Sequence, residues 1–206
     1  MTTRTLSPTD RYPSRVGTEQ KFIKRGDPVL WGPKKDPLDQ VELDQFHHHG
    51  FVVREGLLDP DTVAEGLAEV ERLRADPEVL QSDHVIPDPE TGDFRTLFAV
   101  HDTSPMFEWL AADARLAGVA RQLLDDDVYI HQSILEVNGP LSSHPNPWHS
   151  DFETWHVEDG IPAMRTISAS IALTDNHAWT GPMTMITGSH GWYLSYEDDG
   201  SQSPNE

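Results

Sequence analysis

The sequence predicts a mainly β fold with N-terminal helices, a double-stranded β-helix of the jelly-roll or cupin-like type. Apolar residues recur at helical spacing from about residue 38 to residue 124, and they alternate with a period of two in several later segments. The 16 prolines and 14 glycines indicate many turns between short segments. Helices followed by antiparallel-looking strands are the order expected when helices support a closed sheet.

The first elements are an extended arm, a helix and a short strand. Residues 1–37 are polar and proline-rich, which favours extended or turn structure over a separate domain. A helix is predicted from Leu38 to His49, with Gly50 as its C-cap. Residues 51–54, Phe-Val-Val-Arg, then predict a short strand.

Two longer helices enclose a loop and a strand. Asp59 is a good N-cap and Pro60 a good first helical residue, and apolar residues recur at helical spacing through about Arg74. The following segments are a loop rich in proline and aspartate, a strand and a further helix, at residues 76–93, 95–100 and 105–124.

The later part of the chain is predicted to be β-rich. Strands are expected at residues 128–134, 165–174 and 183–186, because apolar and small polar side chains alternate there or β-forming residues are enriched. A single domain over residues 1–206 is therefore expected. Its parts are an extended arm (1–37), a helical support region (38–125) and jelly-roll strands with the candidate metal motif (126–206).

Composition excludes several classes of function. With 15 basic and 35 acidic residues the formal net charge is −20, which argues against nucleic acid and anionic membranes as partners. No apolar run is long enough for a transmembrane helix, and the N-terminus lacks the apolar core of a secretory signal, so a cytoplasmic location is expected. The absence of cysteine leaves histidine and carboxylate side chains as metal ligands.

The candidate metal ligands are His149 and Asp151, which lie two residues apart. On a strand this spacing projects both side chains to the same face, so an imidazole and a carboxylate can occupy two corners of one metal ion. A second histidine from a distant strand would complete a 2-His-1-carboxylate triad, which leaves positions on Fe(II) open for a 2-oxo acid and dioxygen. Taken alone, a His-x-Asp pair is more often a polar pair on a surface strand.

The run around this pair carries a family resemblance. Residues 148–165, WHSDFETWHVEDGIPAMR, resemble the signature of ectoine hydroxylases, a group within the phytanoyl-CoA dioxygenase superfamily. A match of this length is a specific signal, and it extends over nearly the whole chain. Similar runs are Arg11–Arg15, Asp27–Val29, His49–Val53, Val128–Ser133, Ser170–Asn176 and Gly188–His190.

The resemblance implies a non-haem iron dioxygenase. It implies Fe(II) as cofactor, 2-oxoglutarate and O2 as cosubstrates, and hydroxylation of ectoine to 5-hydroxyectoine with release of succinate and CO2. It also implies that His149 and Asp151 are iron ligands and that Gln132 and Trp155 line the ectoine pocket. An indole face attracts the delocalised amidinium cation of ectoine, and an amide can hydrogen-bond its polar edge.

Two features depart from the family pattern. The family has arginine and asparagine, which help to hold 2-oxoglutarate, where this chain has Ile134 and Glu136. If the following loop is re-registered, Asn138 can serve instead of Glu136. The distal iron-binding histidine, and the arginine that pairs with 2-oxoglutarate, are expected beyond Glu206. The sequence therefore predicts a partial domain, incomplete at its C-terminus, from a fragment or a truncated protein.

Other ionisable residues are expected to have supporting roles. His190 is the best internal substitute for the third ligand, although the family has a histidine there that is not the ligand. The run His47–His49 is expected at a helix end, where histidine suits the helix dipole. Arg165 is expected to pair with one of the acids of the motif. The remaining acids and histidines near the motif are expected to cap loops, to support the ligands or to lie at the surface; they are Glu153, Glu158, Asp159, His144, His156 and the run Asp125–Asp127. The sequence indicates no function for His101, His131 or His177.

Two rival functions stay open. One is a related 2-oxoglutarate dioxygenase acting on another small amino-acid-like substrate, which the changes at Ile134 and Glu136 keep open. The other is a non-catalytic truncated remnant that binds metal weakly or not at all. Succinate release with ectoine against a panel of amino acids tests the first, and Fe(II) uptake tests the second. The sequence leaves the oligomeric state open, a homodimer included.

Overall fold

The computed structural model describes residues 11–12, 22–32, 35–89, 91–137, 148–178 and 180–195. None of the helices in these ranges combines the length and the apolar character needed to cross a membrane. The strands are β1 (Phe22–Lys24), β2 (Val85–Pro87), β3 (Phe94–Phe98), β4 (Ile134–Glu136) and β5 (Trp192–Leu194). The helices are α1 (Gln40–His49), α2 (Pro60–Ala75), α3 (Pro77–Leu80), α4 (Val100–Thr103), α5 (Pro105–Ala112), α6 (Ala114–Leu124) and α7 (Asp151–Thr154), with a π-helical turn at Trp155–Asp159 and a 3-10 turn at Ser189–Gly191.

Local capping signals set the ends of the first two long helices. At the start of α1 the Asp39 carboxylate accepts from the Glu42 N–H, and the Asp39 N–H donates to the Glu42 carboxylate. Gly50 ends α1 with φ 86°, a left-handed conformation that glycine adopts without strain. Asp59 caps α2 by accepting from the Thr62 N–H. The caps predicted at Gly50 and Asp59 are confirmed.

The helix predicted over residues 105–124 is interrupted at Asp113. This residue has a non-helical ψ of 134°. Its carboxylate accepts from the Arg115 N–H at 2.7 Å and also from the Arg115 guanidinium at 2.7 Å. An aspartate that bonds nearby backbone in this way competes with the helix, so α5 ends and α6 begins here. The prediction of one continuous helix is therefore wrong.

The main hydrophobic core lies between the helices and the three-stranded sheet. Leu73 of α2 and Leu97 of β3 are both 0% exposed. Burying a side chain of this size stabilises the fold by about 1.5–3 kcal/mol relative to leaving it in water. The buried members of this main core are Val70, Leu73, Val79, Phe94, Leu97, Val100, Phe107 and Leu110.

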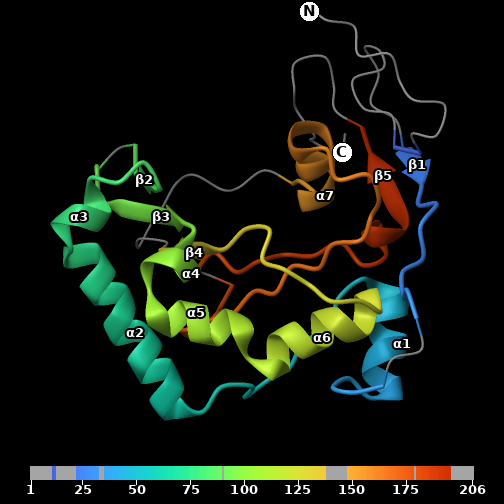
Figure 1. Cartoon of the computed structure of the whole chain (residues 1–206), viewed down its shortest axis with the longest axis horizontal. Coiled ribbons are helices and arrows are strands. Elements are labelled where there is room, and N and C mark those ends of the chain that lie inside the picture. The colour runs from blue at the N-terminus through green and yellow to red at the C-terminus, as the bar shows by residue number, and fades with distance from the viewer. Residues whose placement is uncertain are drawn as a thin grey trace, which may run out of the picture.

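Two small antiparallel sheets complete the described architecture. In one, β3 pairs with both β2 and β4. In the other, β1 pairs with β5, with Ile23 opposite Tyr193. Figure 1 shows β1 and β5 side by side, although they lie near opposite ends of the chain. The N-terminal arm is therefore tied to the last described segment.

Several predicted strands are not strands in the described structure. Residues 51–54, 165–174 and 183–186 belong to no strand, and of residues 128–134 only Ile134 belongs to β4. Alternation of apolar and polar residues predicts a pleated backbone, but a strand also needs a neighbour for its N–H and C=O groups. These segments have no such neighbour among the described residues, so the strand predictions are wrong there.

Candidate functional site

His149 and Asp151 lie where an extended segment meets a short helix. Ser150 between them has φ −122° and ψ 129°, and Asp151 is the first residue of α7. The extended backbone at Ser150 turns the two neighbouring side chains to the same side. His149 Nε2 lies 3.6 Å from Asp151 Oδ1. The prediction that both residues belong to one strand is wrong because α7 begins at Asp151, but the structure does bring the two side chains together.

The second oxygen of Asp151 is held by a serine. Ser168 Oγ donates to Asp151 Oδ2 over 2.7 Å, from the extended segment that follows the motif. The neighbouring His149 side chain lowers the pKa of the Asp151 carboxyl below its usual value; partial burial opposes this, and the hydrogen bond from Ser168 adds to it. About half of each candidate ligand side chain is exposed, 50% for His149 and 46% for Asp151. An ion can therefore reach both.

The donor pair suits a transition metal such as Fe(II). Two ligands at right angles on one ion, each about 2.1 Å from it, lie about 3 Å apart. The 3.6 Å between His149 Nε2 and Asp151 Oδ1 is close to this separation. One imidazole and one carboxylate are two of the three ligands of a facial triad. Within the described ranges no group of three histidine or carboxylate side chains is placed to hold a metal, so the described residues supply two donors.

The helix that begins at Asp151 is anchored in a second hydrophobic cluster, called here the Tyr12 cluster. It consists of Tyr12 from the arm, Phe152 from α7, Met164 from the end of the signature run, and Tyr193 from β5. Tyr12 and Tyr193 are fully buried. Phe152 packs edge-on against Tyr12 with ring centroids 5.3 Å apart. The position of the candidate ligands therefore depends on the arm.

Asp27 is the polar centre of the Tyr12 cluster. Its carboxylate accepts hydrogen bonds from the Tyr12 hydroxyl at 2.7 Å and from the Met164 N–H at 2.9 Å. The Arg11 guanidinium adds an ion pair at 2.9 Å. Burial and the hydrogen bond to Asp27 raise the pKa of Tyr12 above its usual value. A buried carboxylate with several donors is satisfied, so Asp27 joins the arm to the end of the signature run.

Glu153 and His156 hold the motif from its buried side. Glu153 is 1% exposed, and its Oε1 accepts from the Leu194 N–H at 2.8 Å. Burial raises the pKa of the Glu153 carboxyl. His156 Nε2 lies 2.8 Å from the carbonyl oxygen of Tyr12, and Nδ1 lies 2.6 Å from that of Ile161. Both ring nitrogens are engaged, so His156 supports the motif in this conformation instead of ligating a metal, as expected.

The predicted substrate residues lie on two segments that touch. Trp155 begins the π-helical turn and is partly exposed, and Gln132 is exposed in the extended segment before β4. The ring that meets Trp155 is that of His131, with centroids 5.1 Å apart and planes at 73°. Sequence reasoning gave His131 no role. Its position beside Gln132, within a run that resembles the family, is the one feature of the sequence that could have drawn attention to it.

The two positions that depart from the family pattern share one face of β4. Ile134 and Glu136 are exposed, whereas Leu135 between them packs against the main core. An aliphatic side chain and a carboxylate therefore stand on the face where the resemblance led us to expect a cation and an amide. Asn138, the predicted substitute, and His144 lie outside the described residues.

The remaining candidates make structural contacts. His190 lies beside the end of α1, where its Nε2 donates to the His47 carbonyl at 3.0 Å. The run His47–His49 forms the last turn of α1, as predicted. Arg165 pairs with Asp126 at 3.0 Å and donates to the Leu124 carbonyl at 2.8 Å. The expected pairing of Arg165 with a motif acid is wrong, because the end of the signature run lies beside the end of α6.

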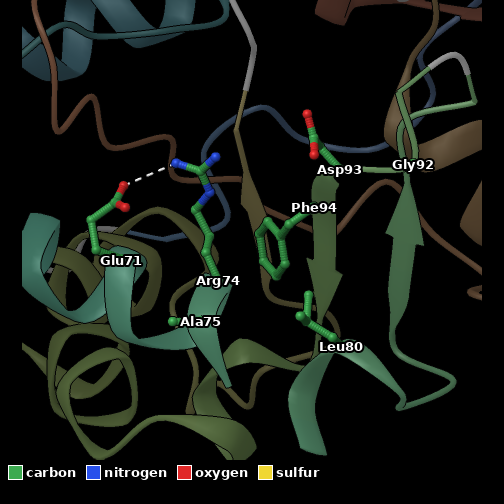
Figure 2. A pocket seen from close by; sticks show the side chains of 7 residues that line it. All are labelled: Glu71, Arg74, Ala75, Leu80, Gly92, Asp93 and Phe94. Atoms are coloured by element: carbon green, nitrogen blue, oxygen red, sulfur yellow. Dashed lines mark hydrogen bonds and ion pairs between the residues drawn. The ribbon is translucent and has the colours of Figure 1, made fainter. Parts of the chain in front are cut away.

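A cavity of about 330 Å³ lies elsewhere, between α2 and the start of β3 (Figure 2). Glu71 and Arg74 on its α2 side form an ion pair at 3.0 Å, and Phe94 lines it from β3. None of the predicted site residues lines it. The cavity is therefore not the candidate site.

Comparisons with known proteins agree with the motif. Residues 46–206 match the family model for phytanoyl-CoA dioxygenase (PhyH). The chain is 43% identical to ectoine dioxygenase of Streptomyces coelicolor over 196 residues, covering 94% of this chain and 65% of that protein. It is 42% identical to ectoine dioxygenase of Sphingopyxis alaskensis, covering 90% of this chain and 61% of that protein. The chain thus spans less than two thirds of the length of these relatives.

Solved structures of similar proteins match the fold of the chain. EctD from S. alaskensis in its apo form matches with a TM-score of 0.88 at 41% identity, covering 96% of this chain and 70% of that one. EctD from S. alaskensis with 2-oxoglutarate and 5-hydroxyectoine matches with a TM-score of 0.87 at 41% identity, covering 96% and 69%. This likeness confirms the predicted fold class, a jelly roll with N-terminal helices.

Proposed function

Because the chain belongs to the phytanoyl-CoA dioxygenase family, we propose that it acts as an Fe(II)- and 2-oxoglutarate-dependent dioxygenase on ectoine. The reaction converts ectoine, 2-oxoglutarate and O2 into 5-hydroxyectoine, succinate and CO2. The observation that carries the proposal is the His149–Asp151 donor pair, 3.6 Å apart within the signature run. The EctD structure with 2-oxoglutarate and 5-hydroxyectoine supports the choice of cosubstrate and product.

The metal would be held by the two atoms that face each other, His149 Nε2 and Asp151 Oδ1. Ser168 occupies the other carboxylate oxygen, so Asp151 presents one oxygen on the side of His149. Iron together with 2-oxoglutarate supplies the oxidising chemistry that hydroxylates a C–H bond. The residues of the chain position the donors and the substrate, and the Tyr12 cluster shields the buried side of α7 from water.

The substrate would bind between the segments of Trp155 and Gln132. Ectoine is a small ring that carries a delocalised amidinium cation and a carboxylate. The partly exposed indole of Trp155 offers a face to the cation, a contact worth about 0.5–2 kcal/mol. The Gln132 amide offers both a donor and an acceptor to the polar groups.

A second substrate is favoured by one observation. Glu136 and Ile134 share the exposed face of β4, and a carboxylate there repels the dicarboxylate 2-oxoglutarate more than an amide does. The second candidate is a related 2-oxoglutarate dioxygenase that acts on another small amino-acid-like substrate, which the changes at Ile134 and Glu136 keep open. The cytoplasmic location and the homodimer stay predictions.

The test is to incubate the protein in air with Fe(II), 2-oxoglutarate and ectoine, and to quantify 5-hydroxyectoine and succinate by NMR. We expect both products in equal amounts. Asp151→Ala should abolish both, whereas Asp83→Ala, a remote and exposed aspartate, should abolish neither. Succinate formed only with an amino acid from a panel would establish the second candidate. A protein that takes up no Fe(II) and forms no succinate would be the non-catalytic remnant.

A further inference from the structure

The His131 side chain contacts two residues of the signature run, Trp155 and Asp159. Its ring packs edge-on against the Trp155 indole, with centroids 5.1 Å apart. Its Nε2 lies 3.0 Å from Asp159 Oδ2. Trp155 and Asp159 are the first and last residues of the π-helical turn, so one imidazole touches both ends of that turn.

The turn itself is short and is closed by a glycine. Gly160 follows it with φ 77°, and its N–H donates to the Trp155 carbonyl. These backbone bonds fix the main chain of the turn but leave the torsions of the Trp155 side chain free. His131, which comes from the segment before β4, contacts the indole from outside the turn and so limits those torsions.

The His131–Asp159 pair is not a significant source of stability. The side chains are 30% and 48% exposed, and ion pairs or hydrogen bonds with that exposure contribute about 0–1 kcal/mol. The pair does, however, fix where the imidazole sits, and the imidazole in turn borders the indole. An edge-to-face contact of two rings has a preferred geometry, so it restricts the indole more than an aliphatic neighbour does.

We propose that His131, held in place by Asp159, is a positioning residue that fixes the Trp155 indole for the cationic ring of the substrate. This inference rests on the proposed function, since it gives Trp155 the cation-binding role. His131 also links the two segments, because it adjoins Gln132 in the chain and its ring contacts Trp155.

The test separates the position of the indole from the binding of substrate. The emission of Trp155 is isolated as the difference between each protein and its Trp155→Phe counterpart, and its quenching by acrylamide is measured without ligand. His131→Ala removes both contacts, His131→Phe keeps the ring and loses the Asp159 bond, and Asp159→Ala removes only the anchor. We expect quenching of Trp155 to rise most in His131→Ala and less in the other two.

Ectoine affinity is then measured by calorimetry on the same variants. We expect His131→Ala to bind about threefold to tenfold more weakly, the effect of misplacing one cation–π contact. His131→Phe should recover part of the affinity. His84→Ala, an exposed histidine on another part of the surface, should change neither quenching nor affinity, and no variant should change the melting temperature by more than a few degrees.

The outcomes are distinguishable. Unchanged Trp155 quenching in His131→Ala would overturn the inference, whatever the affinity. Increased quenching together with weaker ectoine binding would establish it. Increased quenching in a protein whose wild type binds no ectoine would show that His131 positions Trp155 while the proposed function fails.

Discussion

The main core and the Tyr12 cluster are built differently. The eight buried residues of the main core are apolar and lie between Val70 and Leu110 in the sequence. The four members of the Tyr12 cluster come from segments spread between Tyr12 and Tyr193. Buried polar side chains accompany the Tyr12 cluster, and they include Asp27, Glu153 and His156.

The two regions are therefore stabilised by different interactions, and of the two it is the Tyr12 cluster that includes a residue of α7. The main core gains its stability by removing apolar area from water, which tolerates many side chains of similar volume. The Tyr12 cluster depends on hydrogen bonds between named partners, and a buried polar group that loses its partner is costly. The candidate ligands are attached to the Tyr12 cluster through α7. Substitutions there should therefore affect metal binding, and substitutions in the main core should not.

The largest effect is expected for Tyr12→Ala. Removal of a fully buried aromatic ring should lower the free energy of unfolding by about 3–5 kcal/mol. Urea unfolding followed by circular dichroism measures it. A loss below about 1 kcal/mol would mean that the arm is not an integral part of the fold.

Leu73→Ala is the corresponding change in the main core. We expect a loss of about 2–5 kcal/mol in the free energy of unfolding, because a fully buried side chain leaves a cavity among α2, β3 and α5. Metal affinity should stay at the wild-type value under conditions in which the variant is folded. Calorimetric titration with Co(II), as an air-stable probe for Fe(II), tests this. Weakened binding by the folded variant would contradict the separation of core and site.

Ser168→Ala tests the support of the candidate ligand Asp151. The variant loses the 2.7 Å hydrogen bond that orients Asp151 Oδ2, and loss of such a supporting bond typically weakens metal binding about 10- to 100-fold. Ser168→Thr should restore most of the affinity. The matched control is Ser82→Ala, which removes a 2.7 Å hydroxyl bond to the Val79 carbonyl beside the main core. Equal Co(II) affinities for Ser168→Ala and wild type would rule out the orienting role.

The smallest expected effect is on how the free energy of unfolding depends on pH. Partial burial lowers the pKa of His190, which lies beside α1 and bonds to the His47 carbonyl. The unfolded chain, with a histidine pKa of about 6.5, then binds this proton more readily than the folded chain. The stability tied to neutral His190 is present above about pH 6.5 and is lost as the pH falls through the lowered folded value.

His190→Gln tests this pH dependence because glutamine does not titrate. Urea midpoints measured between pH 5 and pH 8 should fall more steeply toward low pH in the wild type than in the variant. Parallel curves would show that His190 is not the group responsible.

Much of the helical part is predictable because its signals are local. Asp39, Asp59 and Gly50 act on backbone groups within one turn of themselves. The break at Asp113 is missed because the apolar spacing continues through it, while its cause is a side-chain bond to Arg115. Too many strands are predicted in the later part of the chain, because alternation of apolar and polar residues does not show whether a segment has a neighbouring strand to pair with.

The site is predictable in part for the same reason. His149 and Asp151 are two residues apart, so local backbone geometry brings them together. Ser168, Tyr12 and Asp27 reach the motif only through the tertiary fold, and no spacing in the sequence indicates their contacts. His131 is missed because a lone histidine in an alternating segment gives no sign that it will meet Trp155.

The Co(II) affinity of Tyr12→Phe, compared with that of Leu73→Ala, tests most directly whether the Tyr12 cluster positions the candidate ligands. The phenylalanine variant keeps the ring but loses the hydroxyl that bonds Asp27, which costs about 1–3 kcal/mol. We predict weaker metal binding in Tyr12→Phe and wild-type binding in Leu73→Ala, although Leu73→Ala loses more stability. Equal affinities in the two variants would contradict the claim that the Tyr12 cluster holds the site.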